Sequence, residues 1–234
     1  MTINYLFDVD GTLTDHRAKI DPDFRKMFGH WAEEQNNIGN KVFFVTGSDK
    51  EKTVQQVGIA LWRYVDGCYQ NCGNQLYHRG RLIKHSSWKM SFDLRILITE
   101  LIEKSLWYGL ADTNVEERVG MVNISTIGRS CTSKQRKEYY NWDTYSLERE
   151  SIAQTIRLAC PELDAAIGGQ ISIDIYPKGK DKAQVLDDME GETIFFGDAC
   201  EEGGNDYSIA KGADFYYNVA NPEETRHLLE TIGK

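Results

Sequence analysis

Short apolar runs of strand length alternate with helix-like segments at both ends of this chain of 234 residues, and this alternation restricts the fold more than any other feature. Residues 2–8, 41–46 and 193–196 predict buried strands, because apolar side chains dominate each run. A helix is expected to begin at Asp21-Pro22, where Asp21 can act as the N-cap and Pro22 fits the first turn. Strands that alternate with helices form parallel sheets, so the two ends of the chain predict one α/β sheet.

The middle of the chain follows a different pattern. Residues 75–83 predict a β-hairpin that turns at Arg79-Gly80, and residues 120–124 and 171–175 predict further strands. Apolar periodicity and turn residues predict the remaining elements, which are helices at 91–107, 133–140, 148–159, 180–189, 205–211 and 222–232 and a strand at 214–218.

These two patterns predict a discontinuous domain with an insertion. Residues 1–79 and 178–234 are expected to form the α/β core, and residues 80–177 a smaller α+β domain. The hydrophobic content of 41% is sufficient for packed interiors.

Net charge and cysteine usage exclude several classes of function. A net charge of -9 argues against nucleic acid or an anionic membrane as partner. The chain has no run of about 18 apolar residues and no cleavable signal at Met1, so we expect no membrane span and a cytoplasmic location. Five scattered cysteines in a chain of this length are expected to be ordinary thiols.

Two acids follow the first predicted strand. Asp8 and Asp10 stand two residues apart, and Gly11 allows a sharp turn because glycine tolerates positive φ. Ligands of open α/β sheets bind at the carboxyl ends of the strands. Convergent carboxylates at this edge indicate a divalent cation, a nucleophile or both.

Polar residues also follow two other strands of the same sheet. They are Thr46-Gly47-Ser48-Asp49, Gly197-Asp198 and Asn205-Asp206, and a parallel sheet brings all of them to one edge. Either Lys180 or Lys182 could add an ammonium group there. Acids, a hydroxyl donor and a lysine are the groups that phosphoryl transfer requires. The alternative for Ser48 is a helix cap, and for each acid a surface position at a turn.

In order and spacing, these segments resemble the four motifs of the haloacid dehalogenase (HAD) superfamily of phosphotransferases. The resemblance implies a HAD-like Rossmannoid parallel-sheet core with an inserted α+β cap domain. It makes Asp8 the nucleophile that forms an aspartyl-phosphate and Asp10 the general acid and base. It also assigns the transferring phosphoryl group to Ser48, with Thr46 as the alternative.

The same resemblance implies a Mg²⁺ site and selects between the two lysines. Lys182, rather than Lys180, would steady the nucleophile and the phosphate. The metal would be held by Asp8, by the main-chain carbonyl of Asp10 and by Asp198, with Asp206 supporting the metal shell.

The inserted domain narrows the resemblance further. Segments 118–131 and 168–182, beginning Arg118-Val119-Gly120-Met121 and Gly168-Gly169-Gln170-Ile171, are similar to the eukaryotic-type phosphomannomutases, which interconvert mannose 6-phosphate and mannose 1-phosphate. The resemblance implies six substrate contacts, which are Arg17, Arg118, Arg129, Arg136, Ser172 and Asp174.

Arginine suits a phosphate anchor because its planar fork can bind two oxygens. The family resemblance further implies a hexose 1,6-bisphosphate as activator and a homodimer that forms through the cap. The preference between mannose and glucose stays open.

Two other functions use the same residues. A HAD sugar-phosphate phosphatase would need every core residue named above but would let water attack the aspartyl-phosphate. A non-catalytic phosphosugar-binding module would have no need for Asp8. The aromatic residues Trp88, Phe92, Trp107 and Tyr108 could form cap core or a dimer face, and core is the preferred interpretation.

Overall fold

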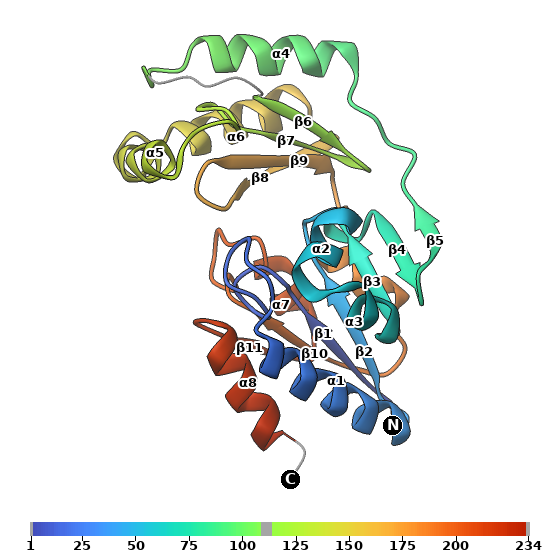
Figure 1. Ribbon diagram of the computed structural model, residues 1–234. Coiled ribbons are helices and arrows are strands. Elements are labelled where there is room, and N and C mark those ends of the chain that lie inside the picture. Colours follow the sequence, from blue (N-terminus) through green and yellow to red (C-terminus); the bar gives the residue numbers. More distant parts are fainter. Residues whose placement is uncertain (1, 109–113, 233–234) are drawn as a thin grey trace. The chain divides into compact units, whose positions relative to one another are not determined.

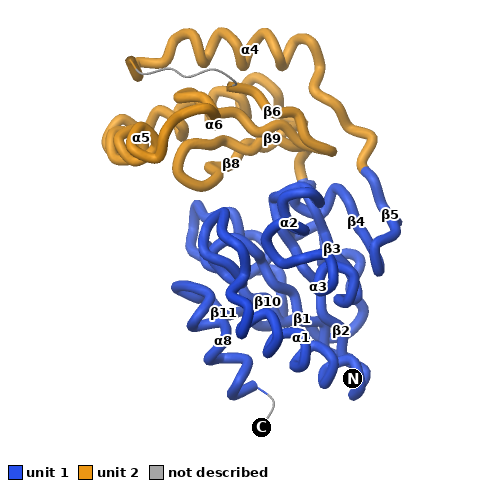
Figure 2. Tube along the Cα trace, in the orientation of Figure 1, with its two compact units in different colours: residues 1–85, 179–234 blue, residues 86–178 orange. Residues whose placement is uncertain are grey.

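The computed structural model describes residues 2–108 and 114–232. The chain forms two compact units, shown in blue and orange in Figure 2. Unit 1 comprises Met1–His85 and Gly179–Lys234, and unit 2 comprises Ser86–Lys178. The assignment of a catalytic core and a substrate-binding cap to parts of the chain stays a prediction.

A seven-stranded sheet forms the centre of unit 1, with the strand order β11-β10-β1-β2-β3-β4-β5 (Figure 1). The five strands from β11 to β3 are parallel, and β4 and β5 form an antiparallel hairpin at one edge. The strands are β1 (Ile3–Phe7), β2 (Lys41–Val45), β3 (Gly67–Gln70), β4 (Gln75–His78), β5 (Arg81–His85), β10 (Glu192–Gly197) and β11 (Phe215–Asn218). The predicted parallel sheet and the predicted hairpin are confirmed.

Helices cover both faces of this sheet. One face carries α1 (Pro22–Asn37), α2 (Lys50–Val57), α3 (Ile59–Tyr64) and α8 (Pro222–Thr231), which pack on aromatic residues such as Phe7, Phe44 and Phe196. The other face carries the 3₁₀ segment η2 (Lys182–Asp188) and α7 (Tyr207–Gly212). A further 3₁₀ turn, η1, spans Asn71–Gly73. Because both faces are covered, the central strands are buried along nearly their whole length.

Local sequence signals set most helix starts. The Asp21 side chain accepts hydrogen bonds from the main-chain N–H groups of Asp23 and Phe24, so the predicted cap of α1 is confirmed. The predicted helix at 180–189 is wrong in type, because this segment is the 3₁₀ element η2. The Gln184 N–H donates to the Asp181 carbonyl oxygen three residues earlier at 3.2 Å, which is the hydrogen-bond spacing of a 3₁₀ turn.

Unit 2 is an antiparallel sheet with the strand order β6-β7-β9-β8. The elements of this unit are α4 (Phe92–Glu103), β6 (Val115–Arg118), β7 (Met121–Ile124), α5 (Ser133–Ser146), α6 (Glu148–Ala159), β8 (Leu163–Gly168) and β9 (Ser172–Pro177). Helices α4 and α6 pack their apolar sides on one face of the sheet. The prediction of a helix to residue 107 is wrong, because α4 ends at Glu103, whereas α5 continues past the predicted end at 140.

The predicted aromatic core of the middle region is only partly formed. Trp107 is 6% exposed and packs on Tyr139, and Trp88 packs against the core of unit 2. Phe92 and Tyr108, however, are 74% and 89% exposed, so the core interpretation is wrong for these two. Phe92 is the first residue of α4 and lies outside its buried stripe of Leu94, Ile98 and Ile102. Among the described residues, every helix is too short or too polar to cross a membrane.

Candidate active site

Three acids meet at the carboxyl edge of the parallel sheet in unit 1. Asp8 directly follows β1 and is 3% exposed, and its main-chain N–H donates to the Phe196 carbonyl oxygen of the neighbouring strand at 2.9 Å. Asp198 directly follows β10, and Asp206 precedes α7 and is fully buried. Each offers a carboxylate oxygen, and the three oxygens lie within 4.8 Å of one another. The fold thus brings together three of the acids that the sequence predicted.

Lys182 lies between two of these acids. Its Nζ is 2.5 Å from Asp8 Oδ1 and 2.5 Å from Asp206 Oδ1, and the side chain is 1% exposed. Lys182 begins η2, which places the ammonium group against the sheet edge. Lys180, the alternative lysine, is exposed.

Burial and mutual repulsion dominate the electrostatics of this cluster. Burial raises the pKa of Asp8 well above its ordinary value, Lys182 opposes this rise, and Asp206 and Asp198 add to it. The pKa of Asp198 is also raised, first by burial and then by Asp206. Burial alone would lower the pKa of Lys182, but the carboxylates of Asp206 and Asp8 outweigh burial and raise it. One lysine therefore does not balance the three clustered carboxylates, and a divalent cation would supply the missing charge.

The backbone leaves room for these carboxylates to converge. Gly11 has φ +92°, and a Cβ there would lie 2.4 Å from Asp198 Oδ2. A Cβ on Gly197 would lie 2.6 Å from Asp206 Oδ2. Only glycine fits at either position. Oxygen donors at close range are what Mg²⁺ prefers, so the donor set fits the metal that the sequence analysis implied.

Asp10 is held by donors on both carboxylate oxygens. Oδ1 accepts from the main-chain N–H of Arg17 and from Gln56 Nε2, both at 2.8 Å. Oδ2 accepts from Ser48 Oγ and from Lys52 Nζ, both at 3.3 Å. Partial burial alone would raise the pKa of Asp10, but Lys52 and these hydrogen bonds lower it. The carboxylate is thus fixed in place and stabilised in its ionised form.

Ser48 is not the cap of the following helix. Asp49 caps α2 by accepting from the Lys52 N–H at 2.8 Å, whereas the Ser48 hydroxyl donates to Asp10. The Ser48 N–H donates to Thr46 Oγ1 at 3.1 Å, so Thr46 supports the loop. These contacts leave Ser48 as the residue whose hydroxyl faces the acids.

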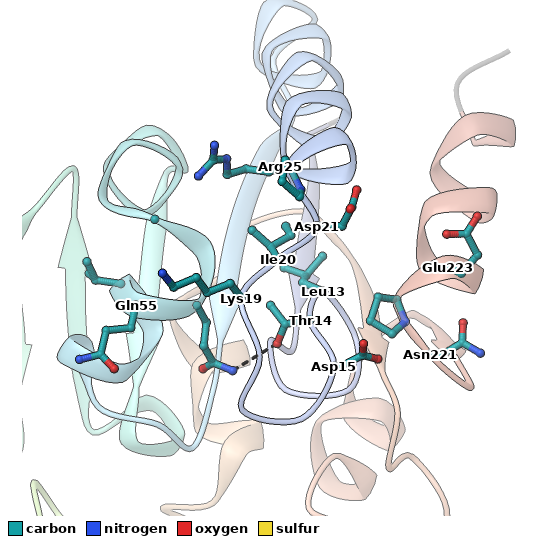
Figure 3. A pocket seen from close by; sticks show the side chains of 15 residues that line it. Leu13, Thr14, Asp15, Lys19, Ile20, Asp21, Arg25, Gln55, Asn221 and Glu223 are labelled. Atoms are coloured by element: carbon teal, nitrogen blue, oxygen red, sulfur yellow. Dashed lines mark hydrogen bonds between the residues drawn. The ribbon is translucent and has the colours of Figure 1, made fainter.

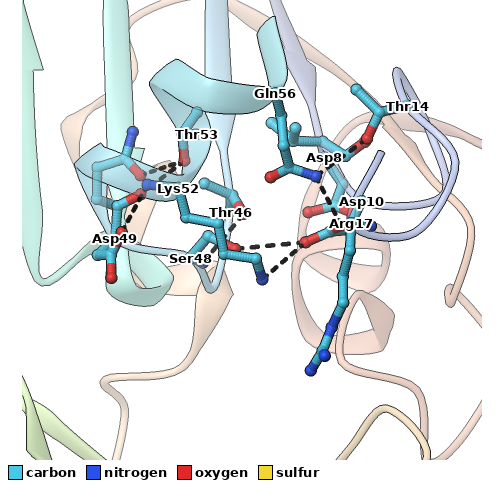
Figure 4. Close-up of polar contacts among 12 residues, drawn as sticks. Asp8, Asp10, Thr14, Arg17, Thr46, Ser48, Asp49, Lys52, Thr53 and Gln56 are labelled. Atoms are coloured by element: carbon cyan, nitrogen blue, oxygen red, sulfur yellow. Dashed lines mark hydrogen bonds and ion pairs between the residues drawn. The ribbon is translucent and has the colours of Figure 1, made fainter. Parts of the chain in front are cut away.

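Sequence analysis missed two residues that hold Asp10. Lys52 and Gln56 lie one helical turn apart on α2, and Figure 4 shows both side chains directed toward Asp10. Their spacing of four residues, just after the Ser48 loop, was the available signal. Arg17, a predicted substrate contact, reaches Asp10 through its main chain, and Figure 4 shows its side chain directed away from Asp8 and Asp10.

The other predicted substrate contacts lie in unit 2. Arg118 ends β6, Arg129 follows β7, and both guanidinium groups pair with the Glu116 carboxylate. Asp174 on β9 accepts from Asn123 Nδ2 at 2.5 Å. Sequence analysis gave no role to Glu116 or Asn123. Asn123 lies within the segment 118–131, but no local pattern shows which residues it faces across the sheet.

Two further predicted contacts lie elsewhere in the same unit. Ser172 begins β9, is 9% exposed, and stands opposite Gly168 in the sheet register. Arg136 is half-buried on α5.

A cavity of about 1130 Å³ opens on unit 1 at a different place (Figure 3). Its wall includes residues of the 13–22 loop, α2 and the start of α8. Gln56 lines it and donates to Thr14 Oγ1 at 3.2 Å, as the dashed line in Figure 3 shows. The fifteen lining residues include neither Asp8 nor Lys182, so this cavity is not the acid cluster.

Solved structures with the same architecture define the fold class. A haloacid dehalogenase-like hydrolase from Bacteroides thetaiotaomicron superposes with a TM-score of 0.63 at 12% identity, covering 99% of this chain and 100% of that one. The C-terminal domain of the trehalose-6-phosphate phosphatase from C. albicans gives a TM-score of 0.65 at 14% identity, covering 99% and 91%. The protein therefore has the HAD fold, as the sequence analysis predicted.

Sequence comparison identifies the family within that class. The model of the eukaryotic phosphomannomutase family matches residues 32–234. The phosphomannomutase of Arabidopsis thaliana is 36% identical over 94% of this chain and 92% of its own length. The phosphomannomutase of Encephalitozoon cuniculi is 34% identical over 98% and 93%. The chain belongs to the eukaryotic phosphomannomutase family, and the predicted family is confirmed.

Proposed function

We propose that this protein is a phosphomannomutase that interconverts mannose 6-phosphate and mannose 1-phosphate through an aspartyl-phosphate on Asp8. The single observation that carries the proposal is the buried Asp8 carboxylate within 2.5 Å of Lys182 at the carboxyl edge of the sheet. Buried acids with perturbed pKa values are concentrated at functional sites, and membership of the phosphomannomutase family identifies the reaction.

Asp8 would act as the nucleophile. An Asp8 oxygen would bond to the phosphorus of a hexose 1,6-bisphosphate while the bond from phosphorus to the sugar oxygen breaks. Asp10 would protonate that departing sugar oxygen. In the second half-reaction Asp10 would remove the proton from a sugar hydroxyl as it attacks the phosphorus on Asp8. The donors on both Asp10 oxygens fix its position and favour its ionised form, which suits it to take the proton from the attacking hydroxyl. The proton gained in that step is the one that Asp10 would return to a departing sugar oxygen in the other half-reaction.

Neighbouring groups would stabilise the charge that develops on the phosphoryl oxygens. The Ser48 hydroxyl lies beside Asp10 and would donate to one of these oxygens. Lys182 would hold Asp8 in its attacking position and favour its ionised form against the effect of burial. Asp8, Asp198, Asp206 and the Asp10 carbonyl would hold Mg²⁺, which would neutralise phosphoryl charge when bound.

The arginines of unit 2 would anchor the phosphate that is not reacting. Arg118 and Arg129 share one carboxylate and so present two guanidinium groups together. We assign Arg17, Arg136, Ser172 and Asp174 to the same substrate, the last two to sugar hydroxyls. A bisphosphate activator follows from the mechanism, because the resting Asp8 must be phosphorylated before the first turnover.

Three further properties belong to this proposal. Activity on glucose phosphates would follow if the sugar hydroxyl contacts tolerate both hexoses. A homodimer would form through the cap, and the exposed Phe92 and Ile96 of α4 are available for such a contact. A cytoplasmic location suits an acidic chain that acts on hexose phosphates.

A coupled assay tests the proposal. Mannose 1-phosphate and a hexose 1,6-bisphosphate are supplied with Mg²⁺, and mannose 6-phosphate and free phosphate are measured together. We expect isomerisation with little phosphate release. Stoichiometric phosphate release without isomerisation would instead identify a sugar-phosphate phosphatase.

A further inference from the structure

The polar face of the unit 2 sheet carries a row of side chains that crosses three strands. Glu116 of β6 stands opposite Asn123 of β7, and Asn123 stands opposite Asp174 of β9. Directly opposed residues project from the same face, so their side chains can meet. Neighbouring positions such as Ile124 and Ile173 face the apolar core instead.

Glu116 joins two arginines. Arg118 Nε and Nη2 donate to its two carboxylate oxygens at 3.0 Å each, and Arg129 Nε lies 2.7 Å from Glu116 Oε2. All three side chains are mostly shielded, with 35% of Glu116, 16% of Arg118 and 19% of Arg129 exposed. Two guanidinium groups this close would repel each other, so the carboxylate between them offsets the repulsion and fixes their orientation.

Asn123 extends this arrangement to Asp174. Its Oδ1 accepts from Arg129 Nη2, and its Nδ2 donates to Asp174 Oδ1 at 2.5 Å. Because a guanidinium only donates hydrogen bonds and a carboxylate only accepts them, the orientation of the Asn123 amide is defined. On the other side of Asp174, Gly168 leaves the necessary space, since a Cβ there would lie 2.8 Å from Asp174 Oδ2.

We propose that Glu116 and Asn123 are positioning residues that hold the phosphate-anchoring arginines and the sugar-binding Asp174 as one rigid hydrogen-bonded array, the Glu116–Asn123 array. This inference rests on the proposed function, because it takes the ligand to be a hexose phosphate. A mutase must hold its bisphosphate intermediate in two orientations, and a fixed spacing between phosphate anchor and hydroxyl contact serves both. The alternative is that Glu116 merely occupies the arginines until a phosphate displaces it.

A matched pair of variants separates these possibilities. Glu116→Gln removes the charge that joins Arg118 and Arg129. Glu117→Gln removes the adjacent carboxylate, which is 46% exposed and pairs with Arg95 of α4. Glu116→Gln loses the ion pairs with Arg118 and Arg129, and Glu117→Gln loses the pair with Arg95. Only the first of these carboxylates belongs to the Glu116–Asn123 array.

Binding of mannose 1-phosphate to each full-length variant is measured by titration calorimetry, and turnover by the coupled assay. We expect Glu116→Gln to weaken binding about tenfold or more, since charge-assisted hydrogen bonds of this kind are each worth more than about 1.4 kcal/mol. It should raise KM by the same factor and change kcat by less than about threefold, because the reacting groups lie in unit 1. Glu117→Gln should bind like the wild type.

Two conservative variants keep the inference testable if Glu116→Gln unfolds. Glu116→Asp retains the charge with a shorter reach and should show an intermediate loss of binding. Asn123→Leu retains volume without hydrogen bonds and should weaken binding although it removes no charge. Unchanged or tighter binding in Glu116→Gln would overturn the inference and favour simple competition with phosphate.

The same measurements separate this inference from the proposed function. A wild-type protein that binds mannose 1-phosphate but does not isomerise it would refute the mutase proposal and leave the comparison of binding intact. A wild type that binds no hexose phosphate would overturn both.

Discussion

The acid cluster of unit 1 and the Glu116–Asn123 array of unit 2 solve opposite electrostatic problems. In unit 1 three carboxylates surround one ammonium group, all of them mostly or fully buried, so the ionised groups carry a net charge of 1 − 3 = −2. In unit 2 the two carboxylates Glu116 and Asp174 are matched by the guanidinium groups of Arg118 and Arg129. A bound cation would offset the charge of the first cluster, whereas the charges of the second already balance.

The comparison indicates which of the two clusters destabilises the fold. Buried like charges destabilise a fold unless a counter-ion or a proton relieves them. Unit 1 accepts that cost at its sheet edge, as the raised pKa values of Asp8 and Asp198 show, with burial as the main cause. In the Glu116–Asn123 array each charged group already has a hydrogen-bonded partner, so the array contributes through the fixed positions of these groups.

The largest effect is expected from the nucleophile. Asp8→Asn should reduce mutase turnover by at least about 10³-fold, because the amide that replaces the carboxylate cannot form the acyl-phosphate. The coupled assay with mannose 1-phosphate measures it, and Asp15→Asn is the control because Asp15 is exposed in the same loop. Substantial turnover in the Asp8 variant would refute the assignment of Asp8 as the nucleophile.

The next effect concerns the stability of unit 2. Arg149 and Asp143 form a buried pair at 2.7 Å, with side chains 6% and 7% exposed, and Arg149 also donates to the Gly169 carbonyl oxygen. Arg149→Met should lower the free energy of unfolding by about 3 kcal/mol, since it leaves a buried carboxylate without its partner. Chemical denaturation measures the loss. Lys134→Met, which removes an exposed pair, should cost less than about 1 kcal/mol.

A divalent cation should stabilise the fold through the acid cluster of unit 1. Mg²⁺ at about 100 times its dissociation constant should stabilise the wild type by about 2.7 kcal/mol, and chelation should reverse this. Asp198→Asn should remove most of that response, and its cation-free form should be at least as stable as the wild type because one buried like charge is gone. Calorimetric unfolding with Mg²⁺ and with a chelator measures both. An unchanged Mg²⁺ response in the variant would place the cation elsewhere.

A smaller catalytic effect is expected from the lysine that holds Asp10. Lys52→Met should lower kcat about tenfold, because Asp10 loses one of its four donors and the only cation among them. Lys50→Met is the matched control on the same helix, since Lys50 instead lies over the rings of Trp62 and Tyr77. Equal losses of kcat in the two variants would mean that the positive charge of α2 matters and that its contact with Asp10 does not.

The smallest effect concerns the pH dependence of stability at Asp214, an acid that does not belong to the acid cluster of unit 1. Hydrogen bonds from the Thr193 N–H and hydroxyl lower the pKa of Asp214 below its ordinary value of 3.8. Its ionised form therefore stabilises the fold above about pH 4, and this contribution is lost as the pH falls through the lowered pKa. Asp214→Asn should be less stable than the wild type at pH 7, and the difference should shrink towards pH 3. Thermal unfolding of both proteins at several pH values measures this difference in stability. A difference that does not change with pH would contradict the assignment.

The sequence predicted best where one local signal decides the outcome. Asp21 caps α1 because its own side chain reaches the first free N–H groups, and such a signal needs no tertiary contact. Asp8, Asp198 and Asp206 were found because strand ends of a parallel sheet share one edge. The end of α4 at Glu103 and the 3₁₀ form of η2 were missed, since packing decides where a helix stops.

Apolar composition was a weaker guide than position. Phe92 and Tyr108 were expected in the core, yet both are exposed because they stand beside the buried stripe of α4 or beyond its end. Lys52, Gln56, Glu116 and Asn123 were missed for a related reason. Their roles depend on which residue faces them across a helix or a strand pair.

The sequence by itself determined the fold class, the family and the acids that meet at the sheet edge, because strand alternation and the motif beginning at Asp8 are local patterns. The tertiary structure decided which residues hold those groups. Lys52 reaches Asp10 across 42 positions, and Glu116, Asn123 and Asp174 align only through the sheet register. Interactions between residues distant in the chain depend on packing and register, and local patterns do not encode either of them.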